Sequence, residues 1–507
     1  MTQIVTIIGF ELTFLWVCSS IYTTLIGVRK VSFVMKASIV RLTGITINNF
    51  KNVVHGSLAF ENTRKNFKAS ILGLYGQNGS GKTALIDAIE LLQHALCGRQ
   101  IPDYFADYIN IDAQEATVTY DFSVRIEEQK YSVSYQLSIR DEAQPGDQNS
   151  SMEQNKAKKI VVKGELIKCP ILTDKQIKSG RLIDTNESDL FTPIPKRTLL
   201  VGKDKNTITE LLVAKKLAAV TSRSFVFSPE LLGVIRERVA AETNDSSELS
   251  FYSDLIEALV EYGNHGLFVI NTSNTGLISL NAQPFVFKYR EKNLGAIGTM
   301  MLPLDSPMVI DQTQKHIVEG ITDNMNIVLT QIIPGLTIRV KDLGAEVKSD
   351  GNVGNRIQLM SCRDGNEIAL KYESEGIKKI VSILQLLIVV YNEPSITVAI
   401  DELDAGVFEY LLGEILRIIS EKGRGQLIFT SHNLRPLETL DRGFIAFTTI
   451  NPNNRFVRMT NVKDNNNLRD LYYRDIMLGE HNEELYEATN NSEIAFAFRE
   501  AGEYSGS

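Results

Sequence analysis

The stretch GQNGSGKT, residues 76 to 83, has residue types and a spacing that suit the binding of a phosphate group. Four residues separate Gly76 from Gly81, and Lys82 and Thr83 follow directly. In loops of this pattern, backbone N–H groups and the N-terminus of the next helix surround an anion. The Lys82 ammonium would reach the β- and γ-phosphates of a nucleotide, and the Thr83 hydroxyl would bind Mg²⁺. We expect the phosphates to be held by Gly76, Asn78, Gly79, Ser80, Gly81, Lys82 and Thr83.

A pair of carboxylates ends the apolar run SITVAIDEL, residues 395 to 403. This run predicts a buried strand that leads directly into Asp401 and Glu402. Open α/β sheets bind their ligands where parallel strands end, so two acids in this place favour a role in chemistry. We expect Asp401 to act on Mg²⁺, directly or through a bridging group, and Glu402 to polarise the attacking water.

A histidine follows the next predicted strand, in the sequence LIFTSHN. A parallel neighbour of the strand before Asp401 would deliver His432 to the same edge of the sheet, close to the γ-phosphate. We therefore favour a catalytic role for His432, as a sensor of that phosphate, over a histidine of the core.

The stretch YESEGIKKI, residues 372 to 380, places Ser374 and Gly376 before a long apolar helix. A serine and exposed glycine amides at a helix start form a second end that can bind an anion. The same residues also suit an ordinary helix cap, and both interpretations stay open here.

The runs around these residues predict an α/β fold. Residues 69 to 76 are continuously apolar and suit a central strand, and residues 82 to 96 suit a helix. Strand, helix, strand, helix and strand follow one another after residue 376, which predicts parallel crossovers. Alternating runs that predict antiparallel strands, with hairpins at residues 127–130 and 363–365, are 39–50, 56–60, 116–126, 131–139, 355–362 and 366–372.

Composition indicates a folded protein with a large core but does not identify its binding partner. The chain has 507 residues, of which 43% are apolar, so it can bury a large core and form more than one structural unit. A net charge of −8 argues against a surface coated with nucleic acid, although a single basic patch is compatible with it. The cysteines are far apart in the sequence and predict neither a zinc site nor a disulfide framework, which fits a reducing cytosol; they are Cys18, Cys97, Cys169 and Cys362.

Two further segments leave alternatives open. Residues 4 to 28 are apolar, carry only the charge of Glu11, and precede Arg29 and Lys30. They predict either an extension that function does not need, with soluble sequence starting at Met35, or a membrane anchor.

From residue 156 to residue 216 the chain has 14 Lys and Arg against 7 Asp and Glu. That excess predicts either solvated helix faces or a contact surface for an acidic partner or nucleic acid.

Taken in order, GQNGSGKT, SEGIKK, VAIDELDAG and FTSHN resemble the phosphate loop, signature, Walker B with D-loop, and switch histidine of ABC-type ATPases. The chain resembles the RecF and OLD-like AAA family ATPases of prokaryotes, including the ATPase subunits of the Septu and PARIS phage-defence systems. The opening TINNFKNVVHGSLAF is similar to the first strands of that group. The resemblance covers residues 36–140 and 345–450.

The chain departs from the pattern of that group in three places. Its signature keeps only Ser374 and Gly376, no Q-loop glutamine can be placed, and the turn DELDAG replaces the usual proline-containing sequence after the catalytic glutamate. The role of Asp404 in that turn therefore stays open.

The resemblance implies an ABC-type head that binds ATP and Mg²⁺ and hydrolyses ATP. Two protomers of a homodimer or of a higher homo-oligomer would meet head to tail, so that Ser374 and Gly376 of one subunit contact the γ-phosphate held by Lys82 of the other. The expected units are an N-terminal extension (1–34), the first part of the head (36–140), a loop and inserted, partly helical subdomain (141–344), the second part of the head (345–465) and a helical tail (466–507).

The sequence shows no set of membrane-spanning segments for transport, no long heptad arms and no nuclease pattern. The leading hypothesis is therefore a cytoplasmic ATPase that gates or senses for a separate effector, a nuclease, in anti-phage defence. The rival hypothesis is a RecF-like ATPase of DNA repair or chromosome maintenance that binds DNA itself. A membrane-attached scaffold is a third interpretation, which requires residues 4 to 28 to be an anchor.

Overall fold

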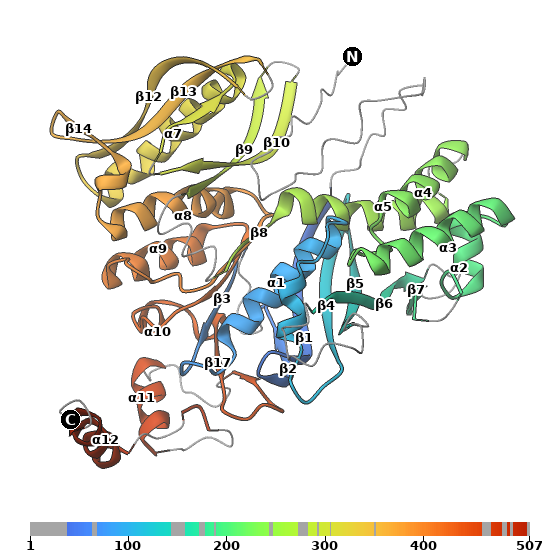
Figure 1. Cartoon of the computed structure of the whole chain (residues 1–507), viewed down its shortest axis with the longest axis horizontal. Helices are drawn as coiled ribbons and strands as arrows, with labels where there is room; N and C mark the ends of the chain where they lie inside the picture. The colour runs from blue at the N-terminus through green and yellow to red at the C-terminus, as the bar shows by residue number, and fades with distance from the viewer. Residues whose placement is uncertain are drawn as a thin grey trace, which may run out of the picture.

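The protein is described from a computed structural model of the whole chain (Figure 1). The described residues are 38–62, 68–142, 158–171, 178–186, 189–242, 247–271, 282–291, 294–304, 306–348, 351–458, 468–478, 484–486 and 490–503. The apolar segment 4–28 and most of the polar stretch 141–159 lie outside them. Within the described part of the chain, no helix is long and apolar enough to cross a bilayer.

A mainly parallel sheet forms the centre of the molecule, with the strand order β18-β17-β3-β16-β15-β8. Neighbours from β17 to β8 run parallel, and only β18 is antiparallel to its neighbour. The parallel crossovers predicted after residue 376 are therefore confirmed. The strands are β3 (Ser70–Tyr75), β8 (Leu267–Ile270), β15 (Thr397–Ile400), β16 (Gln426–Thr430), β17 (Ile445–Thr448) and β18 (Phe456–Val457).

Helices cover both faces of this sheet (Figure 1). Helix α1 (Lys82–Leu96) packs on one face, where Ala399 and Ile428 belong to its hydrophobic core. Alternate residues of the same strands, such as Val398, point into a second core on the opposite face. This second core is shared by α8 (Glu375–Asn392), α9 (Glu409–Lys422) and α10 (Pro436–Thr439). Strands that are buried on both faces have continuous apolar sequences, as residues 69–76 and 395–403 do.

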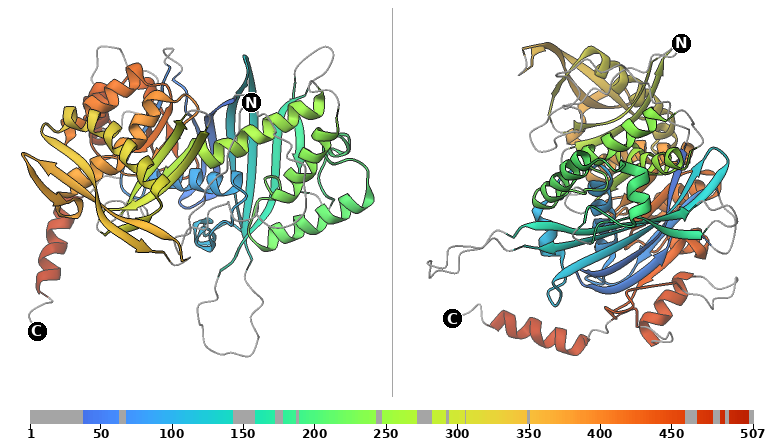
Figure 2. Two further views of the ribbon diagram at one scale, coloured as in Figure 1. Left: turned by 90° about the horizontal axis from the view of Figure 1, so that it is seen from above. Right: turned by 90° about the vertical axis from the view of Figure 1, so that its right-hand side faces the viewer.

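A second, antiparallel sheet lies beside the first, with the order β2-β1-β4-β5-β6-β7. The hairpin predicted at residues 127–130 is confirmed, because β4 and β5 pair directly from Glu115 with Arg140 to Ile126 with Gln129. Its strands are β1 (Ser38–Phe50), β2 (Val53–Ala59), β4 (Glu115–Ile126), β5 (Gln129–Asp141), β6 (Ile160–Ile171) and β7 (Lys178–Asp184). Next to it lie α2 (Ile194–Val201), α3 (Lys205–Val220), α4 (Pro229–Ala241) and α5 (Glu248–Glu261) (Figure 2).

A third group of elements lies over α8. Helix α7 (Gln312–Ile332) packs against β12, and the hairpin predicted at residues 363–365 is confirmed by the pairing of β13 with β14. The strands of this group are β9 (Ala282–Glu291), β10 (Leu294–Pro303), β11 (Met308–Ile310), β12 (Leu336–Val347), β13 (Val353–Arg363) and β14 (Asn366–Ala369). Near the C-terminus, α11 (Leu468–Leu478) and α12 (Asn491–Glu503) follow, and α12 projects from the body of the molecule (Figure 2).

Residues 141–344 are divided among these sheets. Strands β6 and β7 extend the antiparallel sheet, and β8 forms the edge of the central sheet beside β15. The helices expected in this segment do form, as α3, α5 and α7. Pairing between strands distant in sequence is set by tertiary packing, so the local pattern gave no sign of it.

A buried carboxylate ties the antiparallel sheet to the loop before α4. Glu165 of β6 is 1% exposed. One of its oxygens accepts hydrogen bonds from the Tyr135 and Ser224 hydroxyls, and the other accepts from the backbone N–H groups of Phe225 and Val226, at 2.8 and 3.2 Å. Burial raises the pKa of Glu165, and these four donors act in the opposite direction.

Replacement of Glu165 by Gln is expected to destabilise the protein by about 1–3 kcal/mol, because the new NH₂ group would face donors in place of an acceptor. Urea denaturation measures the change. Glu115→Gln is the control: its carboxylate pairs with Lys163 at the surface, and its loss should change the free energy of unfolding by less than about 1 kcal/mol. Equal effects of the two substitutions would contradict this account of Glu165.

Candidate nucleotide-binding site

The predicted phosphate loop connects the carboxyl end of β3 to the first residue of α1. Its glycines have backbone φ angles of +154° (Gly76), +76° (Gly79) and +95° (Gly81). Residues with a Cβ rarely adopt such angles, so the loop needs glycine at these positions. Helix α1 starts immediately at Lys82, which leaves the first N–H groups of the helix at the loop. This is the arrangement that binds an anion.

Strand β17 packs closely against the start of the loop. A Cβ at Gly76 would lie 1.8 Å from the Thr448 Oγ1 atom. The Thr448 hydroxyl is hydrogen-bonded to Ser80 and lies 3.3 Å from the carbonyl oxygen of Tyr75. Ser80 also donates to the carbonyl oxygen of Gln77 at 2.6 Å. The conformation of the loop is therefore fixed from outside as well as by its own glycines.

Lys82 lies inside the loop and is 7% exposed. Its Nζ donates to the carbonyl oxygens of Gly76 and Gln77 at 2.7 and 3.0 Å. Burial lowers the pKa of Lys82, and the carboxylates of the turn 401–404 act in the opposite direction. The exposed side of the loop is formed by Asn78 and Gly79, and Thr83 is half-buried in the first turn of α1.

The predicted acidic pair lies at the end of β15, beside the end of β16. Asp401 is buried, and its Oδ1 accepts from the Thr430 hydroxyl at 2.5 Å. The oxygen of the same hydroxyl accepts from the backbone N–H of Glu402 at 2.8 Å. Glu402 has a φ of +49°. A non-glycine residue in this region stores strain and persists only where surrounding contacts hold it, as often occurs at functional sites.

His432 follows β16 and is exposed, so it is not a histidine of the core. Asp404 joins this segment to the acidic turn, because its Oδ2 accepts from the backbone N–H groups of His432 and Asn433 at 3.1 and 2.9 Å. The structure thus places the Lys82 loop, the Asp401–Glu402 pair and His432 at the carboxyl ends of β3, β15 and β16, which are adjacent in the sheet.

Ser374 and Gly376 lie at the start of α8. The Ser374 side chain accepts from the backbone N–H of Ile377 at 3.3 Å, so it does cap the helix. A Cβ at Gly376 would lie 2.4 Å from the carbonyl oxygen of Gly406, so this helix start packs directly on the acidic turn. Within the described residues, no hydrogen bond joins Ser374 or Gly376 to the phosphate loop of the same chain. The structure therefore brings this helix start to the acidic turn.

Residues distant in the sequence, which no motif indicated, support the phosphate loop. Asn52, in the turn between β1 and β2, donates to the carbonyl oxygen of Gly79. Arg455, which is buried, donates to the carbonyl oxygens of Asn52 and Thr449 at 2.6 and 2.7 Å. Lys51 pairs with Asp87 of α1. Arg455 and Asn52 are about 400 residues apart in the chain, so no local pattern could have paired them.

Asn271 is a further polar residue at this edge of the sheet. It follows β8, whose last residue, Ile270, accepts from the backbone N–H of Asp401 at 2.8 Å. The Asn271 amide donates to Glu90 Oε2 of α1 at 2.6 Å. Burial raises the pKa of Glu90, while the hydrogen bond from Asn271 acts against that rise. The sequence offered no candidate for the Q-loop glutamine of ABC-type ATPases. The polar residue that follows β8 at this edge is an asparagine.

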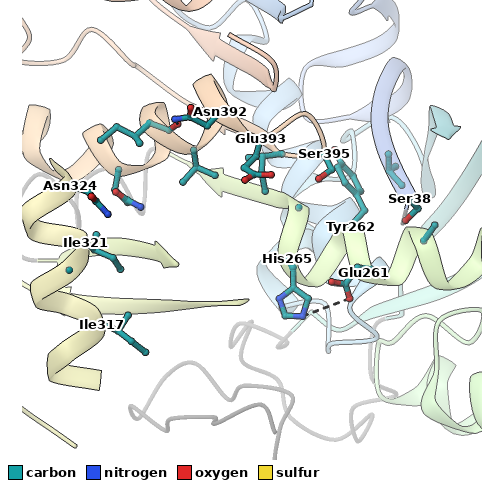
Figure 3. Close-up of a pocket in the computed structure, with 18 of the residues that line it drawn as sticks. Ser38, Glu261, Tyr262, His265, Ile317, Ile321, Asn324, Asn392, Glu393 and Ser395 are labelled. Atoms are coloured by element: carbon teal, nitrogen blue, oxygen red, sulfur yellow. Dashed lines mark hydrogen bonds and ion pairs between the residues drawn. The ribbon is translucent and has the colours of Figure 1, made fainter. Parts of the chain in front are cut away.

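A cavity of about 470 Å³ lies elsewhere in the molecule, between α5, α7 and α8 (Figure 3). It is lined by His265, Glu261 and Asn324 among others, and it also reaches Ser395 and Ile396. These last two residues precede β15, whereas Asp401 follows it. The cavity is therefore at the opposite end of the strand from the acidic pair and is not part of the candidate nucleotide site.

Comparison with known proteins identifies the family. A family model described as "AAA ATPase domain" matches residues 41–435, so the chain belongs to the AAA ATPase domain family. Together with the sheets described above, this confirms the expected α/β ATPase head with a parallel core and antiparallel strands. No protein with a curated description matches the sequence.

Solved structures that match this chain share little sequence with it. One is described as the SmcHead bound to the C-winged helix domain of ScpA, with 12% identity, a TM-score of 0.36, and coverage of 83% of this chain and 98% of that one. Another is the recombination mediator protein RecF with ATP in the RecFOR pathway, with 12% identity, a TM-score of 0.34, and coverage of 83% and 100%. A third is the SMC head domain from Thermotoga maritima, with 12% identity, a TM-score of 0.32, and coverage of 83% and 99%.

The Thr430 hydroxyl is expected to hold the acidic turn in place. Thr430→Val removes both of its hydrogen bonds at nearly constant volume, and should lower the free energy of unfolding by about 1–3 kcal/mol. Thr430→Ser keeps the hydroxyl and should cost clearly less. Thermal denaturation of the two variants measures the difference, and a Val variant as stable as the Ser variant would contradict this role.

Proposed function

We propose that the protein binds ATP at the Lys82 loop and hydrolyses it with Glu402. The observation that supports this most strongly is the meeting of the phosphate loop and the Asp401–Glu402 pair at one edge of the parallel sheet. Membership of an ATPase family supports the nucleotide and the reaction. The site would act in the cytosol, where ATP is available.

Each residue of the proposed site has a separate role. Backbone N–H groups from Gly76 to Gly81 and the start of α1 bind the phosphates, and the Lys82 ammonium neutralises the charge of the β- and γ-phosphates. The groups that fit Mg²⁺ are the Thr83 hydroxyl and the Asp401 carboxylate, since hard oxygen ligands suit this ion. Mg²⁺ would supply charge stabilisation for the phosphoryl group during its transfer.

The hydrolytic step requires an oriented water. Glu402 would accept a hydrogen bond from the attacking water and orient it in line with the γ-phosphorus, and His432 would donate to the γ-phosphate. The shared contact of Asp404 with the backbone of His432 supports this pairing, because it fixes the two segments relative to each other.

We propose that a second copy completes the site. Ser374 and Gly376 are at an exposed helix start and have no hydrogen bond to their own phosphate loop in the described part of the chain. A helix start with free N–H groups can bind the γ-phosphate of a nucleotide held by another subunit. ATP would then lie between two protomers, and its hydrolysis would open the dimer.

The biological role that we propose is the gating of, or sensing for, a separate effector, a nuclease, in anti-phage defence. The resemblance of the motifs to ATPase subunits of phage-defence systems supports it. A RecF-like ATPase that binds DNA directly is the alternative, and the basic excess at residues 156–216 is the observation that favours it.

The contacts of that basic segment bear on the choice between the two roles. Within the described residues, several of its cations already pair with carboxylates; they are Lys158, Lys163, Arg181, Lys196 and Arg197. Paired cations have less charge to offer to a phosphate backbone. Lys168, Lys203 and Lys205 are exposed and could still contact DNA.

The two roles differ in what stimulates ATP turnover. Purified protein would be assayed alone, with duplex DNA, and with the product of the neighbouring gene. A gatekeeper should ignore DNA and form a stable complex with its neighbour. Stimulation by DNA alone, with binding that weakens as salt rises, would instead establish the RecF-like role.

Lys82→Ala is expected to abolish ATP binding, because the ammonium that faces the phosphates is lost. Equilibrium binding of a fluorescent ATP analogue measures the loss. Lys130→Ala is a suitable control, since Lys130 is an exposed lysine of the antiparallel sheet that pairs with Glu61 at the surface. Unchanged ATP affinity in Lys82→Ala would refute the assignment of the phosphate loop.

Glu402→Gln is expected to bind ATP but to lower turnover by at least about 100-fold, because the amide cannot accept the proton of the water. ATP should then trap the dimer, which light scattering detects as a doubled mass. Normal turnover in this variant would remove Glu402 from the catalytic role.

A further inference from the structure

Helix α8 carries a buried lysine to which the proposed function gives no role. Lys379 is 1% exposed, and its Nζ has no hydrogen-bond partner among the described residues. Removing an ammonium group from water without a hydrogen bond is costly, so such a group is rare in a folded protein. The next residue along the helix, Ile380, and much of the same helix face are ordinary core.

The carboxylates that act most strongly on the Lys379 ammonium belong to the acidic turn at residues 401–404. The ammonium interacts with the carboxylates of Glu402, Asp404 and Asp401, in that order of strength. Burial lowers the pKa of Lys379, and these carboxylates oppose that change. Helix α8 packs on this turn through the contact of Gly376 with Gly406, so the lysine and the turn are on adjoining elements.

The acidic turn contains a buried carboxylate oxygen without a hydrogen bond from any described residue, whose charge is opposite to that of the Lys379 ammonium. Asp404 Oδ2 accepts from the backbone of His432 and Asn433, but Asp404 Oδ1 is buried and has no partner within the described part of the chain. A buried cation and a buried carboxylate oxygen, both without hydrogen bonds, therefore lie on adjoining elements. Each lowers the cost of burying the other through their Coulomb attraction, which is strong away from water.

We propose that Lys379 is the positioning residue of the acidic turn, and that its buried charge fixes Asp404 and through it the Glu402 and His432 segments. Asp404 is the link, because it is in the same turn as Glu402 and bonds the backbone at His432. Glu402 has a left-handed backbone, which needs such support from outside. Lys379 itself touches no reacting atom. It acts from the start of α8, next to Ser374 and Gly376.

Lys378 provides a matched control. It is on the same helix, is also buried, and has the same side chain, but its Nζ pairs with Glu375 of its own helix at 2.6 Å. Lys379→Met and Lys378→Met each replace a lysine stem by an apolar chain of similar length. Only the first removes the charge that faces the turn.

Hydrogen exchange of the full-length protein tests the positioning role without any need for turnover. In Lys379→Met, the amides of Leu403, Ala405 and Val407, which form hydrogen bonds within or beside the turn, should exchange at least about 10-fold faster. Lys378→Met should leave them unchanged, and Lys379→Arg should restore part of the protection. Unchanged exchange in Lys379→Met, or faster exchange spread evenly over α8 and the central sheet, would overturn the proposal.

Steady-state kinetics provide a second test, which rests on the proposed ATPase function. Lys379→Met should lower kcat by about 10- to 100-fold, as the loss of a supporting charge does, while KM for ATP changes little. Asp404→Asn should have a similar effect, and the double variant should lose no more than either single one, since both charges act on the same turn. Additive losses, or a rise in KM without a fall in kcat, would overturn the proposal. Wild-type protein that binds ATP without hydrolysing it would refute the ATPase function instead, and hydrogen exchange would still decide the role of Lys379.

Discussion

The parallel order β17-β3-β16-β15-β8 determines which residues meet at the candidate site. Parallel strands end at one edge, so residues that follow β3, β15 and β16 meet there although up to about 350 residues separate them along the chain. The Thr430 hydroxyl joins the ends of β15 and β16 and holds the backbone at Glu402. Without this shared edge, the phosphate loop and the acidic turn would be separate features with no common chemistry.

The phosphate loop and the acidic turn are held in place by elements on opposite faces of the central sheet. On one side, α1, the β1–β2 turn and Arg455 fix the phosphate loop. On the other side, α8 carries Ser374, Gly376 and Lys379 to the acidic turn. The loop and the turn can therefore respond to different neighbours. In the proposed ATPase, nucleotide binding at the phosphate loop would be transmitted to a partner protein through the acidic turn and α8.

Local patterns predicted much of this arrangement. The phosphate loop, the hairpin at residues 127–130 and the strand before Asp401 were predictable because each depends on a few consecutive residues with a defined period or turn. The long-range pairings were not predictable. Nothing near Arg455 in the sequence indicates Asn52, and nothing near Glu165 indicates its donors at Phe225 and Val226. Lys378 and Lys379 look alike in sequence, and only packing shows that Lys378 pairs along its helix while the Lys379 ammonium is buried without a hydrogen-bond partner among the described residues.

Mixed dimers show whether two copies complete one nucleotide site, as we propose. A Lys82→Ala chain lacks the phosphate-loop ammonium, and a Ser374→Asp chain keeps a good helix cap but places a negative charge where the second copy's γ-phosphate would bind. We expect that neither chain turns over ATP alone. An equal mixture should recover about a quarter of wild-type turnover, because half of the dimers would contain one intact composite site. Full activity of Ser374→Asp alone, or an inactive mixture in which mixed dimers are shown to form, would contradict the account.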